Sequence, residues 1–225
     1  MASKLDNSFL CAMKKSFQAY NSKGARSNEK LIPIHTWLAN EIEQRLGTEY
    51  SVKSVGHGGE SQIEGKYYPK REDITISIKQ TPIVVLSFKF VTSNYAQNSN
   101  NYFENLLGET ANIRRVGVGF AHFLVLRGHT PYYDKAAGNK RGKQKKIEVL
   151  EGTHLMKYVK LFRDVDFPHK PDILGMAILD FNRDQPYFTN LDELELTDEI
   201  KKIITDEFSL QKFLDRVVAL CKLKT

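Results

Sequence analysis

The feature that most constrains the fold of this chain is an apolar run, IVVLSFKFV, at positions 83–91. The run is rich in β-branched and aromatic side chains and too short to span a membrane, so it predicts a strand buried in a sheet. Lys89 lies within it. Because a buried ammonium group is costly unless it has a partner or a chemical role, the run also predicts a specific role for Lys89.

Side-chain alternation assigns the residues of this strand to two faces, with Ser87 and Lys89 on one face and Phe88 on the other. The preceding segment 73–78, DITISI, alternates in the same way, and a short turn ending in proline separates the two segments. This pattern predicts a β-hairpin. In such a hairpin Asp73 lies near the open end, where Lys89 also lies.

An acid and a lysine on a polar strip of an apolar sheet have two interpretations. They form a structural ion pair on a solvated face, or they form the site of a metal-dependent phosphodiesterase. In the second case Asp73 binds Mg²⁺, and Lys89 orients or activates the attacking water beside the phosphate.

Periodicity predicts helices and strands on both sides of this hairpin. Helices are expected at about 5–20, 33–46, 98–115 and 151–163, with two more near the C-terminus, and strands at 49–55, 62–68, 73–78, 83–91, 120–127 and 173–181. This order predicts an α/β (α+β) fold with a central mixed sheet flanked by helices. We expect one domain, 1–225, with its core at about 33–181 and helical elements at both ends.

The chain carries a net charge of +6, and the charge is distributed unevenly. Basic residues cluster in 127–148, where several glycines predict a mobile loop, whereas acidic residues cluster in 192–207. This asymmetry is expected when one surface binds a polyanion. Lys140, Arg141 and Lys143 are therefore candidate contacts to DNA phosphates.

The sequence also bears on location. The N-terminal segment lacks the apolar core of a signal peptide, and no apolar run approaches the length of a membrane helix. Cys11 and Cys221 lie near opposite ends of the chain and match no metal-ligand spacing, which favours free thiols in a reducing compartment. We expect a soluble cytoplasmic protein without a membrane partner.

Asp73, a hairpin and Ser87-Phe88-Lys89 at the end of an apolar strand resemble the motif of the PD-(D/E)XK nucleases, and type II restriction endonucleases in particular. The resemblance covers roughly residues 60–127, including the tract SNYAQNSNNYFENLLGETANIRR. It implies a restriction-endonuclease-like fold and Mg²⁺-dependent, sequence-specific cleavage of double-stranded DNA, with Asp73 as metal ligand and Lys89 as the catalytic lysine. Palindromic cutting would imply a homodimer.

The chain departs from this motif at two positions. Glu72, not proline, precedes Asp73, and Ser87 occupies the second acidic position. The superfamily that the chain resembles includes a Ser-x-Lys variant, in which the following helix supplies the missing carboxylate. We expect Glu104 to be that residue, as a catalytic and metal-binding group, with Glu109 and Glu60 as alternatives.

Glu104 is preferred because it lies on a face of the helix 98–115 that differs from the apolar one. Gly108 lies on the same face and costs helix stability, about 1 kcal/mol relative to alanine. A glycine at this place predicts close approach by DNA or by another helix.

Amide side chains follow the predicted catalytic strand at Asn94, Gln97, Asn100 and Asn101. Amides suit phosphates and adenine edges, although the same residues are also common in turns and helix caps. Arg114 and Arg115, at the end of the helix, and the basic loop complete the candidate DNA contacts. Ser87 in the acidic position keeps two alternatives open, a non-catalytic nucleic-acid-binding protein and a repair or junction-resolving nuclease.

Overall fold

The computed structural model describes residues 3–24, 27–135 and 141–225. The helices are α1 (Lys4–Lys23), α2 (Ile32–Glu43), α3 (Tyr95–Arg114), α4 (Gly152–Arg163), α5 (Asp198–Asp206) and α6 (Leu210–Leu223), with two 3₁₀ turns, η1 (Asn28–Lys30) and η2 (Leu191–Glu193). The strands are β1 (Tyr50–Ser54), β2 (Ser61–Glu64), β3 (Pro69–Glu72), β4 (Ile74–Ile78), β5 (Thr81–Phe90), β6 (Gly119–Arg127), β7 (His129–Lys135), β8 (Arg141–Val149), β9 (Ile173–Asn182) and β10 (Gln185–Phe188).

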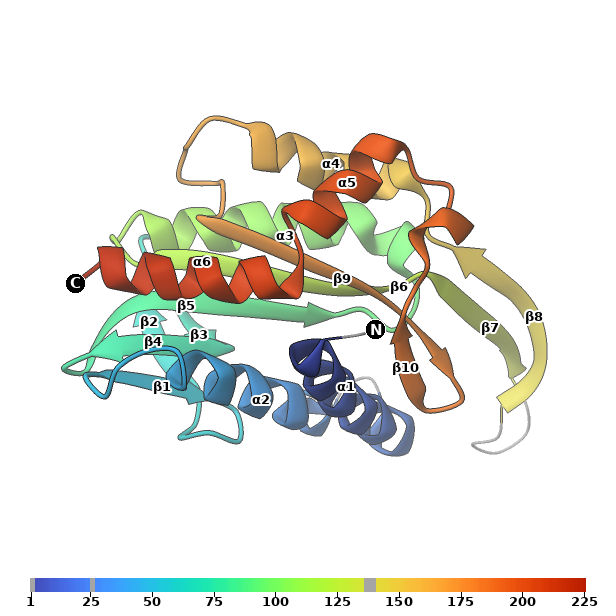
Figure 1. Cartoon of the computed structure of the whole chain (residues 1–225), viewed down its shortest axis with the longest axis horizontal. Coiled ribbons are helices and arrows are strands. Elements are labelled where there is room, and N and C mark those ends of the chain that lie inside the picture. Colours follow the sequence, from blue (N-terminus) through green and yellow to red (C-terminus); the bar gives the residue numbers. More distant parts are fainter. Residues whose placement is uncertain (1–2, 25–26, 136–140) are drawn as a thin grey trace.

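A six-stranded mixed sheet in the order β1-β4-β5-β6-β9-β10 forms the centre of the molecule (Figure 1). Strands β1, β4 and β5 pair antiparallel, β5, β6 and β9 pair parallel, and β10 returns antiparallel to β9. Helix α3 makes the crossover between the parallel strands β5 and β6. The predicted α/β class with a mixed sheet flanked by helices is confirmed.

Each face of the sheet is covered by a different set of helices, with α3, α4 and α5 above it and α1 and α2 below it in Figure 1. Helices α1, α2 and α6 pack on the face to which Leu86 and Phe88 of β5 point. Helices α3, α4 and α5 pack on the face of Val85. The alternation read from the run 83–91 thus separates two apolar cores, and Ser87 and Lys89 belong to the face beneath α3.

The small hairpin β2–β3 is anchored to α3 by one buried amide. Asn112 accepts hydrogen bonds from the backbone N–H groups of Tyr67 and Tyr68 and donates one to the Tyr68 carbonyl. A Cβ at Gly65 would lie 2.1 Å from the Asn112 side chain, so glycine permits this close approach. The predicted strand 62–68 is therefore replaced by β2, a turn held by α3, and β3.

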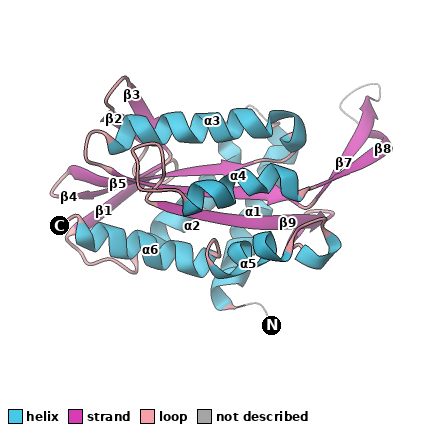
Figure 2. Ribbon diagram, turned by 90° about the horizontal axis from the view of Figure 1, so that it is seen from above, coloured by secondary structure: helices cyan, strands magenta, loops and turns pink. Residues whose placement is uncertain are grey.

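In its described part, the basic stretch, predicted to be a mobile loop, forms the two-stranded antiparallel ribbon β7–β8. The ribbon projects from the body of the molecule in Figure 2. The loop prediction was wrong because it weighed glycines and charge above the strand-forming Tyr132, Tyr133, Ile147 and Val149. Lys140 lies outside the described residues. Strand β10 also escaped prediction, and its proline lies on an edge strand, where a missing N–H is tolerated.

Within the described ranges, no helix combines the length and the apolar character that crossing a membrane requires.

Candidate active site

The β4–β5 hairpin brings Asp73 to the strand that carries Lys89. Ile74 pairs with Leu86, and the turn passes through Lys79 and Gln80, both in the left-handed region. Directly before β4, the Asp73 Oδ2 atom accepts a hydrogen bond from the Phe88 backbone N–H at 2.8 Å. The predicted hairpin is confirmed, and it holds one carboxylate oxygen at the backbone between Ser87 and Lys89.

Glu109, on α3, is the carboxylate that lies beside Ser87. The Ser87 hydroxyl donates to Glu109 Oε2 at 3.4 Å, and the Lys70 ammonium of β3 lies 2.7 Å from Glu109 Oε1. The two side chains of this ion pair are only 20% and 16% exposed, so it is shielded from bulk water. One carboxylate of the following helix therefore faces the position where the strand lacks an acid.

Glu104, the expected residue, is placed elsewhere. Glu104 is exposed, and its charge is felt by Lys157 of α4. Burial lowers the pKa of the Lys157 ammonium group, and Glu104 opposes that effect. Residues 104 and 109 are separated by about 140° around a helix, so both cannot face the sheet. Of the three glutamates considered from the sequence, Glu109 is the one that lies beside Ser87, and Glu104 faces another part of the molecule. Glu60 is exposed ahead of β2.

Glu72 brings a third carboxylate to this region and is almost fully buried, with 1% of its surface exposed. Its Oε1 atom has no hydrogen-bond partner in the part of the chain that the structure describes. Burial raises the pKa of Glu72 to about 7; Lys70 and Lys89 oppose the rise, whereas Glu109 and Asp73 add to it. These effects place Glu72 in one electrostatic cluster with both lysines and both other acids.

Two further buried polar groups lie on this part of the sheet. His122 of β6 is the register partner of Ser87, and Thr75 of β4 pairs with Val85 on the same face. Among the described residues, His122 Nδ1 and Thr75 Oγ1 have no hydrogen-bond partner. Burial, with smaller contributions from Lys89 and Lys70, lowers the pKa of His122 to about 3, so the imidazole is neutral at pH 7.

Lys70, Glu72 and His122 were missed in the sequence. For Lys70 and Glu72 the only signal was the charged run KRED, which ends at Asp73. Local sequence does not show that this run pairs with β2. His122 lies in a mostly apolar strand and matches no metal-ligand spacing, so the sequence gave no signal for it.

The donor set suits a hard cation in part. Carboxylate oxygens are the ligands that Mg²⁺ prefers, and the unpartnered oxygen of buried Glu72 is available to one. However, in the described ranges no three His, Cys, Asp or Glu side chains converge in a geometry that holds a metal ion. If a cation binds beside Ser87, Asp73 and Glu109 would be its candidate ligands, and the Lys70 ammonium pairs with one of the Glu109 oxygens in this structure.

The predicted amide contacts divide between two places. Asn94 precedes α3 in a left-handed conformation, and Gln97 and Asn101 are exposed on the first turns of α3. Asn100 accepts a hydrogen bond from the Lys157 ammonium at 2.8 Å and lines a groove beside α4. The amides thus lie along α3 rather than around Asp73.

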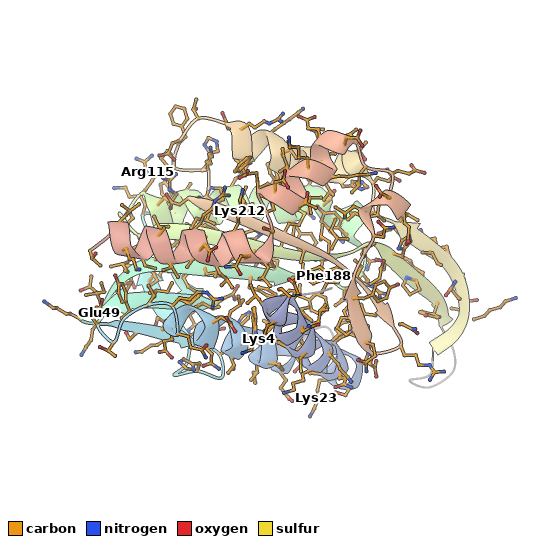
Figure 3. All side chains as sticks on the ribbon, in the orientation of Figure 1. Lys4, Lys23, Glu49, Arg115, Phe188 and Lys212 are labelled. Atoms are coloured by element: carbon orange, nitrogen blue, oxygen red, sulfur yellow. The ribbon has the colours of Figure 1, made fainter. Side chains whose placement is uncertain are left out.

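The two predicted arginines differ. Arg114 binds Asp166, Asp172 and two backbone carbonyls, so its guanidinium already has several partners within the chain. Arg115 is exposed and lies at the end of the molecule opposite the ribbon (Figure 3). Lys143 is exposed on β8, and Arg141 begins that strand.

Comparisons of the chain with protein families, with curated proteins and with solved structures give no match.

Proposed function

We propose that the protein is a Mg²⁺-dependent endonuclease that cuts double-stranded DNA in the manner of a type II restriction enzyme. The observation that carries this proposal is the position of Glu109. The motif at Asp73 and Lys89 lacks its second acid, and α3 brings a carboxylate to 3.4 Å from the Ser87 hydroxyl that stands in its place. The succession β4, β5, α3 and β6 also agrees with a restriction-endonuclease-like fold.

The side chains of this site have separate roles in the proposed reaction. Asp73 and Glu109 hold the cation, which when bound supplies positive charge beside the phosphate and lowers the pKa of water. Lys89 orients the attacking water. Lys70 holds the Glu109 carboxylate toward Ser87 and must share it with the cation. Neutral His122, beside Ser87 on the neighbouring strand, adds no further positive charge to the cluster.

The β7–β8 ribbon is the proposed source of affinity for DNA. Lys143, Lys145 and Lys146 are exposed on β8, and a two-stranded ribbon fits the major groove of B-DNA. Cutting both strands of a palindromic site requires two active sites, so we propose a homodimer acting on DNA in the cytoplasm.

A non-catalytic DNA-binding role is the second candidate, and the Lys70–Glu109 ion pair favours it. This contact of 2.7 Å occupies a carboxylate oxygen that a cation would otherwise use. If the ion pair persists in Mg²⁺, the site binds phosphate without hydrolysing it.

The two candidates are separated by incubating the purified chain with supercoiled plasmid DNA and Mg²⁺. We expect discrete linear fragments, and no fragments from Asp73→Asn or Lys89→Ala. Lys53→Ala, a change at an exposed lysine of β1, serves as the control and should cut normally. Duplex binding in Ca²⁺ without cutting in Mg²⁺ would support the non-catalytic candidate, and nicking confined to branched DNA would indicate a junction-resolving nuclease.

A further inference from the structure

The base of the β7–β8 ribbon contacts the junction between β5 and α3. Asn94, five residues after Lys89, donates its backbone N–H to the Tyr132 hydroxyl at 2.9 Å. Tyr132 donates in turn to Glu148 Oε2 at 3.2 Å, and the other carboxylate oxygen, Oε1, accepts from the Ala96 N–H at 3.5 Å. Two ribbon side chains therefore bind two of the backbone N–H groups with which α3 begins.

These contacts replace a cap that α3 otherwise lacks. Among the described residues, the Asn94 side chain makes no capping hydrogen bond, and Asn94 itself adopts a left-handed conformation with φ of 57°. The first N–H groups of a helix need partners, and a carboxylate near them is favoured by the helix dipole. Glu148 and Tyr132 provide both from a separate element.

The same tyrosine is in contact with the exposed surface of the ribbon. The Lys146 ammonium lies 5.0 Å from the centre of the Tyr132 ring, and Lys146 is the register partner of Tyr132 on β8. A DNA phosphate that attracts Lys146 therefore acts on the side chain that holds Asn94.

We propose that Tyr132 and Glu148 are positioning residues that couple duplex binding on the ribbon to the candidate active site. They hold the start of α3, the helix that carries Glu109, and the junction that directly follows the Lys89 strand. When DNA phosphates draw Lys146 outward, Tyr132 and Glu148 shift with it. The start of α3 and the end of β5 are thereby positioned relative to the phosphate to be cut. The inference rests on the proposed nuclease function.

The test uses Tyr132→Phe and Glu148→Gln, which preserve side-chain shape while removing the hydroxyl or the charge. The probe is a labelled duplex spanning a site that the wild-type protein cuts in plasmid DNA. We expect single-turnover cleavage at saturating protein to fall about tenfold or more in Mg²⁺, with the dissociation constant in Ca²⁺ changed less than about threefold. Asp134→Asn, which removes a carboxylate elsewhere on the ribbon, should cleave at the wild-type rate.

A double-variant cycle distinguishes coupling from a structural effect. Lys146→Ala should weaken duplex binding, and in combination with Tyr132→Phe the loss of cleavage rate should be smaller than the product of the two single losses. Wild-type rates in both single variants, a loss of affinity equal to the loss of rate, or independent effects in the cycle would overturn the coupling while leaving the nuclease function intact. Absence of cutting by the wild-type protein would overturn the proposed function, and the coupling with it.

Discussion

Two ionic clusters lie at the second half of α3, and they differ in how well their polar groups are satisfied. Around Arg114, the guanidinium binds Asp166, Asp172 and the carbonyls of Phe167 and Lys170, and Asp172 also accepts the Phe120 N–H. Around Glu109, five residues earlier, the buried atoms Glu72 Oε1, Thr75 Oγ1 and His122 Nδ1 have no partner within the described ranges.

The contrast separates a structural cluster from a candidate functional one. Folded proteins pair nearly all their buried polar groups, so a group left unpaired needs a reason such as a ligand, an ion or a catalytic role. The Arg114 cluster fastens the end of α3 to the loop before β9 and to the start of β6. The Glu109 cluster contains Asp73, Glu72, Lys70 and Lys89 and retains unused donors and acceptors.

The largest expected effect comes from the carboxylate beside Ser87. Glu109→Gln should lower the rate of DNA cleavage by about 100-fold or more, because a charged oxygen ligand is lost with little change in shape. Glu104→Gln is the matched control on the same helix and should retain activity. The measurements are plasmid cleavage in Mg²⁺ and the shift in unfolding temperature on adding Mg²⁺. Normal cleavage by Glu109→Gln, or equal losses in both variants, would contradict the assignment.

The Arg114 cluster should affect stability instead of chemistry. Arg114→Ala leaves Asp172 and two carbonyls without their partner, and we expect the free energy of unfolding to fall by about 3 kcal/mol. Arg115→Ala, one residue further at an exposed position, should change it by less than about 0.5 kcal/mol. Urea unfolding measures both. Weaker DNA binding by folded Arg114→Ala, at unchanged stability, would restore Arg114 as a DNA contact.

The sequence predicted the parts of this site that depend on local pattern. Alternation along 83–91 assigned Ser87 and Lys89 to one face, and the hairpin turn brought Asp73 to their strand. The choice between Glu104 and Glu109 depended on how α3 rotates against the sheet, which only tertiary packing decides. The position of Lys70 beside Glu109 depends on the β2–β3 hairpin, which Asn112 of α3 holds in place.

The ribbon shows the same limit from another side. Charge and glycines predicted a loop, but strand pairing depends on the cross-strand partners, such as Tyr132 with Lys146, that no local window contains. The helix was expected to begin at about 98, but it begins at Tyr95, and the ribbon residue that binds the Asn94 N–H was not foreseen. Non-local contacts therefore account for most of what the sequence left open.

A smaller effect concerns buried Glu72 in metal-free protein. Its folded pKa of about 7 exceeds the ordinary value of 4.5, so the folded protein retains a proton that the unfolded chain releases. The wild-type free energy of unfolding should therefore fall, relative to that of Glu72→Gln, by about 2 kcal/mol as the pH rises from about 5 to 7. Unfolding at several pH values in a chelating buffer measures this difference. Parallel pH profiles would show that Glu72 has partners in the folded protein.

The smallest expected effect lies at Gly108, directly before Glu109 on α3. Apart from the adjoining residues of α3 itself, no atom of the described residues lies within 4 Å of the position that a Cβ would occupy there, so within those ranges no other helix packs against this position. Gly108→Ala should therefore raise the free energy of unfolding by about 1 kcal/mol, because alanine favours the helix and meets no neighbour. A loss of stability would show that the position is not open.

The approach of DNA to α3 is tested by Gly108→Leu, which separates an effect on DNA binding from an effect on folding. If the duplex passes over this face beside Glu109, the leucine should weaken duplex binding in Ca²⁺ while the chain stays folded. Unchanged binding would place the duplex away from Gly108.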